Sequence, residues 1–167
     1  MTFLLLLFIL PLSLVEAALR NITIGSSDSS IRFEPGWLPS TNQLSGDMFL
    51  TFNTVNRLAL KVTLPEWTQR VIYLGLKRVG GSLYGLCSNC EDNNSSVILV
   101  DGNDRSLESD DQSAPTEIFS LDVDCNQRNT FTLINFPDNR FDSSSTITFE
   151  SLVVTIDDGC EAPPSSG

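Results

Sequence analysis

The chain has 167 residues, of which 10 are Lys or Arg, 21 are Asp or Glu and none is His, giving a formal net charge of -11. So acidic a chain offers no basic surface for phosphates, and we expect no nucleic-acid partner. Without an imidazole, Ser-His-Asp and Cys-His nucleophiles, His-ligated zinc and haem are excluded. We therefore expect no enzyme, with a small hydrolase that uses two carboxylates as the alternative.

The chain opens with an apolar run over residues 3–15, followed by Glu16 and Ala17. The run is too short to cross a bilayer as a helix, which needs about 20 residues, and it has the length of a signal-peptide core. We interpret residues 1–17 as a cleaved signal peptide, with a buried core helix as the alternative. This interpretation predicts a secreted, extracellular protein at the cell surface or in the cell wall.

After residue 20, short segments of alternating polarity and turn residues replace any helical periodicity. This pattern is typical of an all-β fold, and we predict one antiparallel β-sandwich domain over residues 18–158. The expected strands, in chain order, are 22–24, 31–33, 48–53, 57–64, 70–77, 97–101, 117–123, 129–136 and 146–156.

Two of these strands carry further information. Strand 70–77 has apolar residues on both faces, which predicts a central position in its sheet. In strand 146–156, the apolar residues Ile147 and Phe149 are odd-numbered, whereas a second apolar set is even-numbered: Leu152, Val154 and Ile156. Because side chains alternate between the two faces of a sheet, we expect a β-bulge near Ser151.

The cysteines are Cys87, Cys90, Cys125 and Cys160. On a secretory route they are expected to be oxidised rather than metal-bound. We predict a Cys87–Cys90 disulfide that closes a tight turn and a Cys125–Cys160 disulfide that ties the start of one strand to the end of the last. A redox CxxC motif would need a βαβ unit, and a four-cysteine zinc site would need a second close pair.

Secretion would also make three sequons meaningful, with Asn21, Asn93 and Asn94 as acceptors. We expect at least one of them to be glycosylated. Residues 159–167 are rich in Pro and Ser and have the composition of a linker. We expect contact with a membrane only through an anchor beyond Gly167.

The longest expected loop, 101–115, is acidic. Asp101, Asp104, Asp110 and Asp111 are candidate ligands for a structural calcium ion, because hard cations prefer carboxylate and carbonyl oxygens. Because the spacing does not match an EF-hand, we favour a solvated acidic loop and keep the calcium site as the alternative. No other cofactor is expected.

The segment 73–90, with its Tyr-x-Gly, Arg, Gly-Gly, Tyr and Cys-x-x-Cys series, resembles a family of uncharacterised secreted and single-pass surface proteins of basidiomycete fungi. The resemblance continues in order through Asp101-Gly102 and Asp138-Asn139-Arg140 to Ile147-Thr-Phe149. It implies an ectodomain similar to a galactose-binding-like jelly roll. Many members of this family continue through a Pro/Ser-rich linker into a transmembrane helix.

By fold analogy, the resemblance favours a non-catalytic extracellular module that binds carbohydrate, such as a cell-wall glycan, or another surface ligand. Sugar sites often combine an exposed ring with nearby polar groups. The candidate ligand-binding residues are Trp67, Tyr84 and Arg78, and Trp67 is the ring expected to be most exposed. The alternative is a structural or adhesive surface protein without a discrete sugar site.

Overall fold

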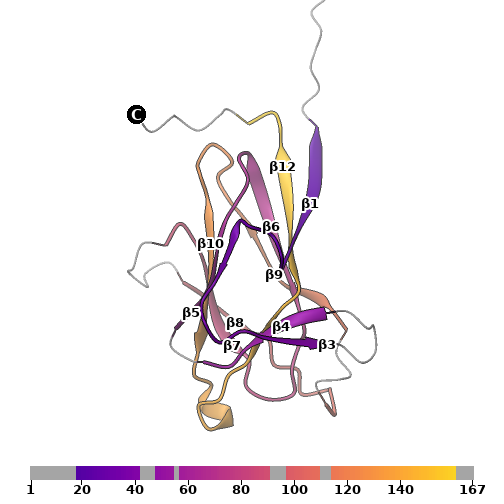
Figure 1. Cartoon of the computed structure of the whole chain (residues 1–167), viewed down its shortest axis with the longest axis vertical. Helices are drawn as coiled ribbons and strands as arrows, with labels where there is room; N and C mark the ends of the chain where they lie inside the picture. The colour runs from indigo at the N-terminus through magenta and orange to yellow at the C-terminus, as the bar shows by residue number, and fades with distance from the viewer. Residues whose placement is uncertain (1–17, 42–47, 55–56, 91–96, 110–113, 161–167) are drawn as a thin grey trace, which may run out of the picture.

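The computed structural model describes residues 18–41, 48–54, 57–90, 97–109 and 114–160 (Figure 1). The expected signal peptide, most of the expected linker, and Asn93, Asn94, Asp110 and Asp111 lie outside these residues. No helix in the described part is long and apolar enough to cross a membrane. The elements are β1 (Leu19–Gly25), β2 (Ile31–Phe33), β3 (Leu38–Thr41), β4 (Met48–Phe52), β5 (Arg57–Thr63), β6 (Thr68–Gly75), β7 (Leu83–Ser88), β8 (Ile98–Asp101), β9 (Thr116–Asp122), β10 (Thr130–Phe136), the 3-10 helix η3 (Asn139–Phe141), β11 (Ile147–Phe149) and β12 (Ser151–Asp157).

The strands form three antiparallel sheets. A four-stranded sheet has the order β1-β12-β6-β9, a five-stranded sheet the order β2-β5-β10-β7-β8, and a three-stranded sheet the order β11-β4-β3. Figure 1 shows β5 and β10 on one side of the molecule and β1, β6 and β12 on the other. The chain is therefore an all-β sandwich, as the sequence predicts, and β6 is a central strand. The finer expectation of a galactose-binding-like jelly roll stays a prediction.

The core lies between the two larger sheets and is built by strand alternation. In the five-stranded sheet, Phe131 pairs with Val62 and Leu133 with Leu60, and all four side chains are at most 1% exposed. Each such side chain contributes roughly 1.5–3 kcal/mol through burial. Tyr73 fills the core from β6 of the opposite sheet.

The Tyr73 ring stacks on Phe149 with 6.1 Å between ring centroids, and its hydroxyl donates a hydrogen bond to the Thr148 carbonyl. Burial raises the pKa of this hydroxyl well above its usual value, so the group stays a neutral donor. A buried tyrosine needs such a partner, because an unpaired hydroxyl in the core would be costly. The contact therefore ties β6 to β11.

The last expected strand is divided at Glu150. Its first part, β11, pairs with β4 in the three-stranded sheet, and its second part, β12, pairs with β1 and β6. The Glu150 amide donates to the Leu74 carbonyl (3.1 Å), and both Phe149 and Leu152 are fully buried. The predicted switch from odd-numbered to even-numbered core residues is thus present at Glu150. It occurs where the chain passes from the three-stranded sheet to the four-stranded sheet, and not as a β-bulge within one strand.

Both expected cysteine pairs are at disulfide distance. The Cα atoms of Cys87 and Cys90 are 5.8 Å apart, and those of Cys125 and Cys160 are 6.1 Å apart, within the usual range. Two such disulfides indicate an oxidising, extracellular environment. The Cys125–Cys160 pair joins the chain just after β9 to the chain just after β12, so it spans the strand β6 that lies between them.

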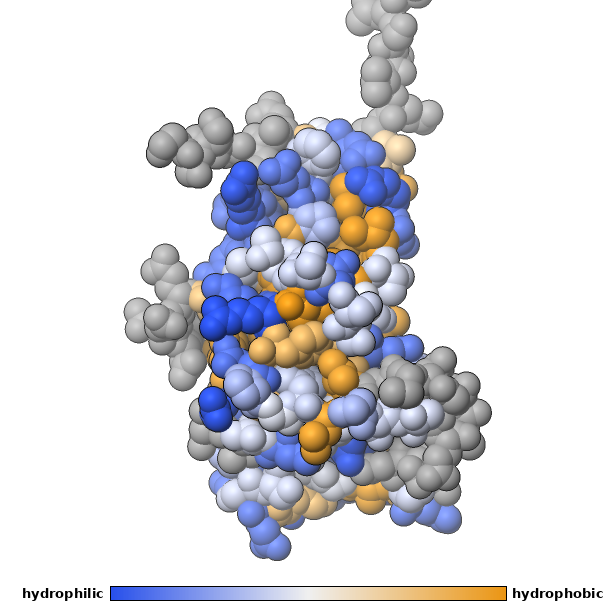
Figure 2. All heavy atoms as spheres, in the orientation of Figure 1, coloured by the Kyte–Doolittle hydropathy of each residue, from blue (hydrophilic) through white to orange (hydrophobic). Residues whose placement is uncertain are grey.

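Hydrophilic residues dominate the face of the molecule in Figure 2, where apolar residues reach the surface only as a narrow, interrupted band. Among the described residues, the large apolar side chains that stay exposed are Leu19, Leu38, Ile98 and Leu99. Of these, Leu19 adjoins a surface depression.

Candidate functional site: a polar depression on the four-stranded sheet

The outer face of the four-stranded sheet carries a surface depression of about 760 Å³. Its lining residues come from all four strands of that sheet and are mostly polar. They are Leu19, Asn21, Gln69, Arg70, Asp122, Val123 and Thr155.

Four of these side chains form one row across the sheet. Asn21 of β1 pairs with Thr155 of β12, Thr155 pairs with Arg70 of β6, and Arg70 pairs with Asp122 of β9. Directly paired residues place their side chains on the same face, and the neighbouring Val71 points into the core with 1% exposure. With adjacent strands about 4.8 Å apart, the row is roughly 14 Å long.

Contacts within the row and with Ser120 of β9 orient these groups. The Thr155 hydroxyl donates to Asn21 Oδ1 (2.8 Å), and Arg70 Nη2 donates to Ser120 Oγ (3.0 Å). Arg70 Nε lies 3.9 Å from Asp122 Oδ1, with the two side chains 48% and 83% exposed. The row therefore presents an amide, a hydroxyl, a guanidinium and a carboxylate to solvent, which together can donate and accept several hydrogen bonds.

Leu19 adds an apolar wall at one margin of the depression. Its side chain is 64% exposed and lies on the same edge strand as Asn21, two residues earlier. Val123 provides a second apolar contact near Asp122. Within the described lining there is no aromatic ring, so these aliphatic groups supply the apolar contact.

The three ligand-binding residues expected from the sequence lie elsewhere. Trp67 is half-buried, packs against the core and has a positive φ of 62°, and its carbonyl accepts a hydrogen bond from the Asp157 amide (2.9 Å). Tyr84 is 2% exposed and meets Tyr73 edge to face in the core. Both rings therefore contribute to packing, and neither lines the depression.

Arg78 lies beyond the end of β6, where it forms an isolated bridge with Asn103. Its backbone amide donates to the Gly102 carbonyl (3.0 Å), and its carbonyl accepts from the Asp104 amide (2.7 Å). This bridge anchors the start of the acidic loop to the turn after β6. The turn itself includes Gly81, at a φ of +56°, where a Cβ would lie 2.2 Å from the Ser144 carbonyl oxygen.

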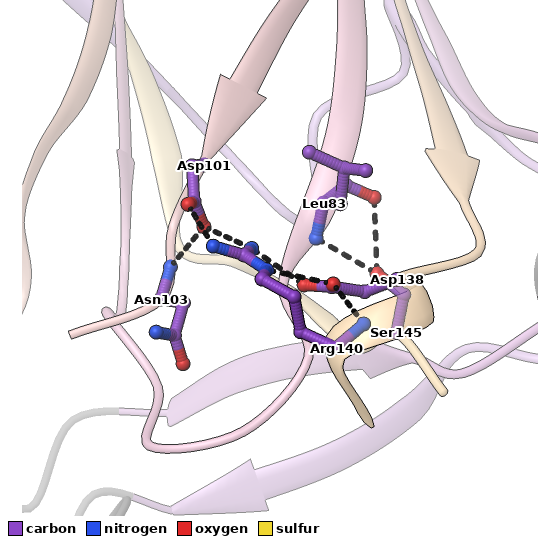
Figure 3. A network of polar contacts seen from close by, with 6 residues as sticks. All are labelled: Leu83, Asp101, Asn103, Asp138, Arg140 and Ser145. Atoms are coloured by element: carbon purple, nitrogen blue, oxygen red, sulfur yellow. Dashed lines mark hydrogen bonds and ion pairs between the residues drawn. The ribbon is translucent and has the colours of Figure 1, made fainter. Parts of the chain in front are cut away.

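The acidic loop begins in an ion-pair network (Figure 3). Arg140 makes two hydrogen bonds to Asp101, from Nη1 to Oδ2 (2.6 Å) and from Nη2 to Oδ1 (2.9 Å). Its Nε and Nη2 also donate to the two oxygens of Asp138 (2.8 and 2.6 Å). Asp138 caps η3 and is 1% exposed. One guanidinium thus joins the end of β8 to the turn that follows β10.

A second contact ties the same turn to β7. The Leu83 amide donates to Ser145 Oγ (2.9 Å), and that hydroxyl donates back to the Leu83 carbonyl (3.0 Å), as Figure 3 shows. Together with Arg140, this pair of bonds fixes η3 and the following turn against the start of β7 and the end of β8. The network is therefore a structural clamp.

The expected calcium ligands have other partners in the described part of the chain. Asp101 is paired with Arg140, and Asp104 Oδ1 accepts from the amide and hydroxyl of Ser106 (2.9 and 2.6 Å). No group of three or more Asp, Glu or Cys side chains among the described residues is arranged to hold a metal ion. The calcium hypothesis therefore depends on Asp110 and Asp111, which lie outside those residues.

The Arg140 clamp predicts a loss of stability in acid. Hydrogen bonds from Arg140 hold the pKa values of Asp101 and Asp138 below their usual range. The unfolded chain, in which Asp has a pKa of about 3.9, therefore binds protons first as the pH falls. The stability that these carboxylates provide is present above about pH 4 and is lost as the pH falls through their folded pKa values. Melting curves recorded from pH 7 to pH 2 test this.

In that pH series, Asp138→Asn should flatten the fall in melting temperature below about pH 4, because one of the linked protonations is removed. Asp122→Asn is the matched control, since Asp122 is highly exposed and lies in the depression rather than in the clamp. An Asp138→Asn protein with the same acid slope as the wild type would contradict the assignment.

Of this row, the sequence marks Asn21 as the acceptor of a sequon, and no local pattern marks Arg70, Asp122 or Thr155. The row has no local sequence motif, because its members lie on four strands and come together only through the pairing of β1, β12, β6 and β9. The depression must therefore be interpreted from its own geometry. No model of a known protein family matches the chain, and no curated protein matches it.

Proposed function

We propose that the protein is a non-catalytic extracellular module that binds carbohydrate, such as a cell-wall glycan, in the depression of the four-stranded sheet. The observation that carries this proposal is the row formed by Asn21, Thr155, Arg70 and Asp122. Sugars present neighbouring hydroxyl groups that both donate and accept hydrogen bonds, which the amide, hydroxyl and charged groups of the row can match.

The shape of the site favours an extended ligand. A row of roughly 14 Å suits a segment of several sugar units rather than one monosaccharide, given the strand spacing. Leu19 and Val123 line the same depression and can cover the apolar face of a sugar ring. The disulfides support an extracellular setting in which such glycans occur.

Binding is favoured over hydrolysis by the charges at the site. Glycoside hydrolysis commonly uses two carboxyl groups on either side of the scissile bond. Asp122 is the single carboxylate in the described lining of the depression, and it lies beside Arg70. A carboxylate that is 83% exposed and lies beside a guanidinium can accept hydrogen bonds from sugar hydroxyls, and the described lining holds no second carboxyl group to complete a hydrolytic pair.

The first test is a glycan array followed by titration calorimetry on the best ligand. Arg70→Ala should weaken binding about tenfold or more, because a charge-assisted hydrogen bond contributes roughly 1.5–3 kcal/mol and 1.4 kcal/mol corresponds to tenfold. Arg32→Ala is the matched control: its side chain is 82% exposed and lies on β2 of the other large sheet. Binding should persist at high salt, since the ligand is expected to be neutral.

Three other results would contradict the proposal. Equal loss of affinity in Arg70→Ala and Arg32→Ala would place the site elsewhere. A blank array together with retained attachment to cell walls would favour the structural or adhesive alternative. Turnover of a polysaccharide that is abolished by Asp122→Asn would favour the carboxylate-dependent hydrolase.

A further inference from the structure

We propose that Asn21 is N-glycosylated and that the first sugars of this attached glycan lie in the depression, where they compete with an external glycan. This inference rests on the proposed function, because it concerns the same surface. Its starting observation is that one residue has two properties: Asn21 begins the sequon Asn21-Ile22-Thr23 and also lines the depression. Asn21 and Thr23 are both exposed on β1, an edge strand.

The Asn21 side chain is oriented in a way that is compatible with this modification. The Thr155 hydroxyl donates to Oδ1 of Asn21, so a substituent on Nδ2 leaves that hydrogen bond intact. The donor would be a lipid-diphosphate-linked oligosaccharide. The Nδ2 atom forms a bond to C1 of the terminal sugar and loses a proton, the bond from C1 to the phosphate oxygen breaks, and the lipid diphosphate leaves.

The position of Asn21 favours a glycan that lies on the protein. Because β1 is an edge strand, Asn21 stands at one margin of the depression, and the polar row runs from it across β12 and β6 to Asp122 on β9. Leu19, at the same margin, offers an apolar contact to the sugar nearest the attachment point. The attached sugars therefore meet the same groups that we assign to an external ligand.

Attachment gives this glycan an advantage over free ligands. A ligand held by a short flexible linker has an effective concentration in the millimolar range at its site. An external glycan displaces the attached sugars only when the ratio of its concentration to its dissociation constant exceeds the same ratio for the attached sugars. Glycosylation of Asn21 would thus set whether the depression is available.

The experiment compares two variants of the full chain secreted from a eukaryotic host that glycosylates. Both carry Asn93→Gln and Asn94→Gln, so that Asn21 is the remaining acceptor. Thr23→Ala removes the sequon while Asn21 is kept, and Thr23→Ser keeps the sequon as the matched control. The measurements are peptide mass spectrometry at Asn21, the Nε–H resonance of Arg70 by NMR, and binding to the glycan array.

We expect the Thr23→Ser protein to carry a glycan on Asn21 and to show a shifted Arg70 resonance relative to Thr23→Ala. The Arg32 resonance, from the other large sheet, should be the same in both. External glycans should bind the Thr23→Ala protein at least tenfold more tightly. An unmodified Asn21, or a glycan on Asn21 that leaves the Arg70 resonance unmoved, would overturn the inference.

The outcome separates the two proposals. A Thr23→Ala protein that binds no glycan on the array would contradict the proposed function. The Arg70 resonance would still decide by itself whether the attached sugars lie in the depression.

Discussion

Removing the Cys125–Cys160 disulfide should lower the free energy of unfolding by about 3–4 kcal/mol. The pair closes a loop with a sequence separation of 35 residues, and the chain-entropy model assigns a loop of this length a stabilisation of that size. The disulfide also joins β9 to β12 across β6, so it limits separation of strands that are not neighbours. The variant Cys125→Ala/Cys160→Ala avoids a leftover thiol, and urea denaturation measures the effect.

The matched control is Cys87→Ala/Cys90→Ala, in which the sequence separation is 3. A loop this short restricts the unfolded chain far less than the longer loop does. The Cys87→Ala/Cys90→Ala variant should therefore lose clearly less stability than the Cys125→Ala/Cys160→Ala variant. The m-value should rise in the Cys125/Cys160 variant, because its unfolded chain exposes more surface. Equal losses in the two double variants, or a loss below about 1 kcal/mol for the longer loop, would contradict the argument.

Arg140→Ala should cost about 2–3 kcal/mol, because it leaves the Asp138 carboxylate in a buried position without its charged partner. The Asp138 side chain is 1% exposed, and it receives hydrogen bonds from both Nε and Nη2 of Arg140. The contact with Asp101 adds less, since that side chain is 46% exposed and solvent screens the pair. Thermal or urea unfolding at pH 7 measures the effect.

Two controls distinguish the clamp from an ordinary surface ion pair. Arg128 lies 3.6 Å from Glu66 with both side chains largely exposed, so Arg128→Ala should cost less than about 1 kcal/mol. Adding Asp138→Asn to Arg140→Ala should recover part of the loss, because the unpaired buried charge is removed. A cost for Arg140→Ala no larger than that for Arg128→Ala would show that the clamp contributes little to stability.

The strands that alternate regularly could be predicted from the sequence. β5 begins at the expected residue, because Leu60 and Val62 repeat with the period of a strand while Lys61 faces solvent. The sequence pattern does not predict β7, because Gly85 interrupts the alternation of its side chains. In the structure that glycine is required by packing: a Cβ there would lie 2.2 Å from Val97 and 2.6 Å from Phe136. The need for glycine at this position is set by Val97 and Phe136, which are distant in the sequence, so no local pattern could predict it.

The charged residues illustrate the same limit. The sequence allows two interpretations of the acidic loop, a calcium site and a solvated surface, and neither involves Arg140. In the structure Asp101 binds the guanidinium of Arg140, which lies 39 residues further along the chain. Local composition around Asp101 does not identify this partner, because it lies in a distant turn. Likewise, the row in the depression depends on strand order, including a register shift between Thr155 and Ile156, which no local pattern specifies.

The pairing of the first described strand with the last has a consequence during protein synthesis. Asn21 and Thr155 are hydrogen-bonded although they are 134 residues apart in the sequence. At about 5–20 residues per second, β1 would leave the ribosome roughly 7–27 s before the part of β12 that it pairs with. During that interval Asn21 lies in an unpaired segment, where a modifying enzyme can reach its amide. Completion of β12 then pairs β1, so the length of time for which Asn21 lies on an unpaired segment depends on the speed of translation.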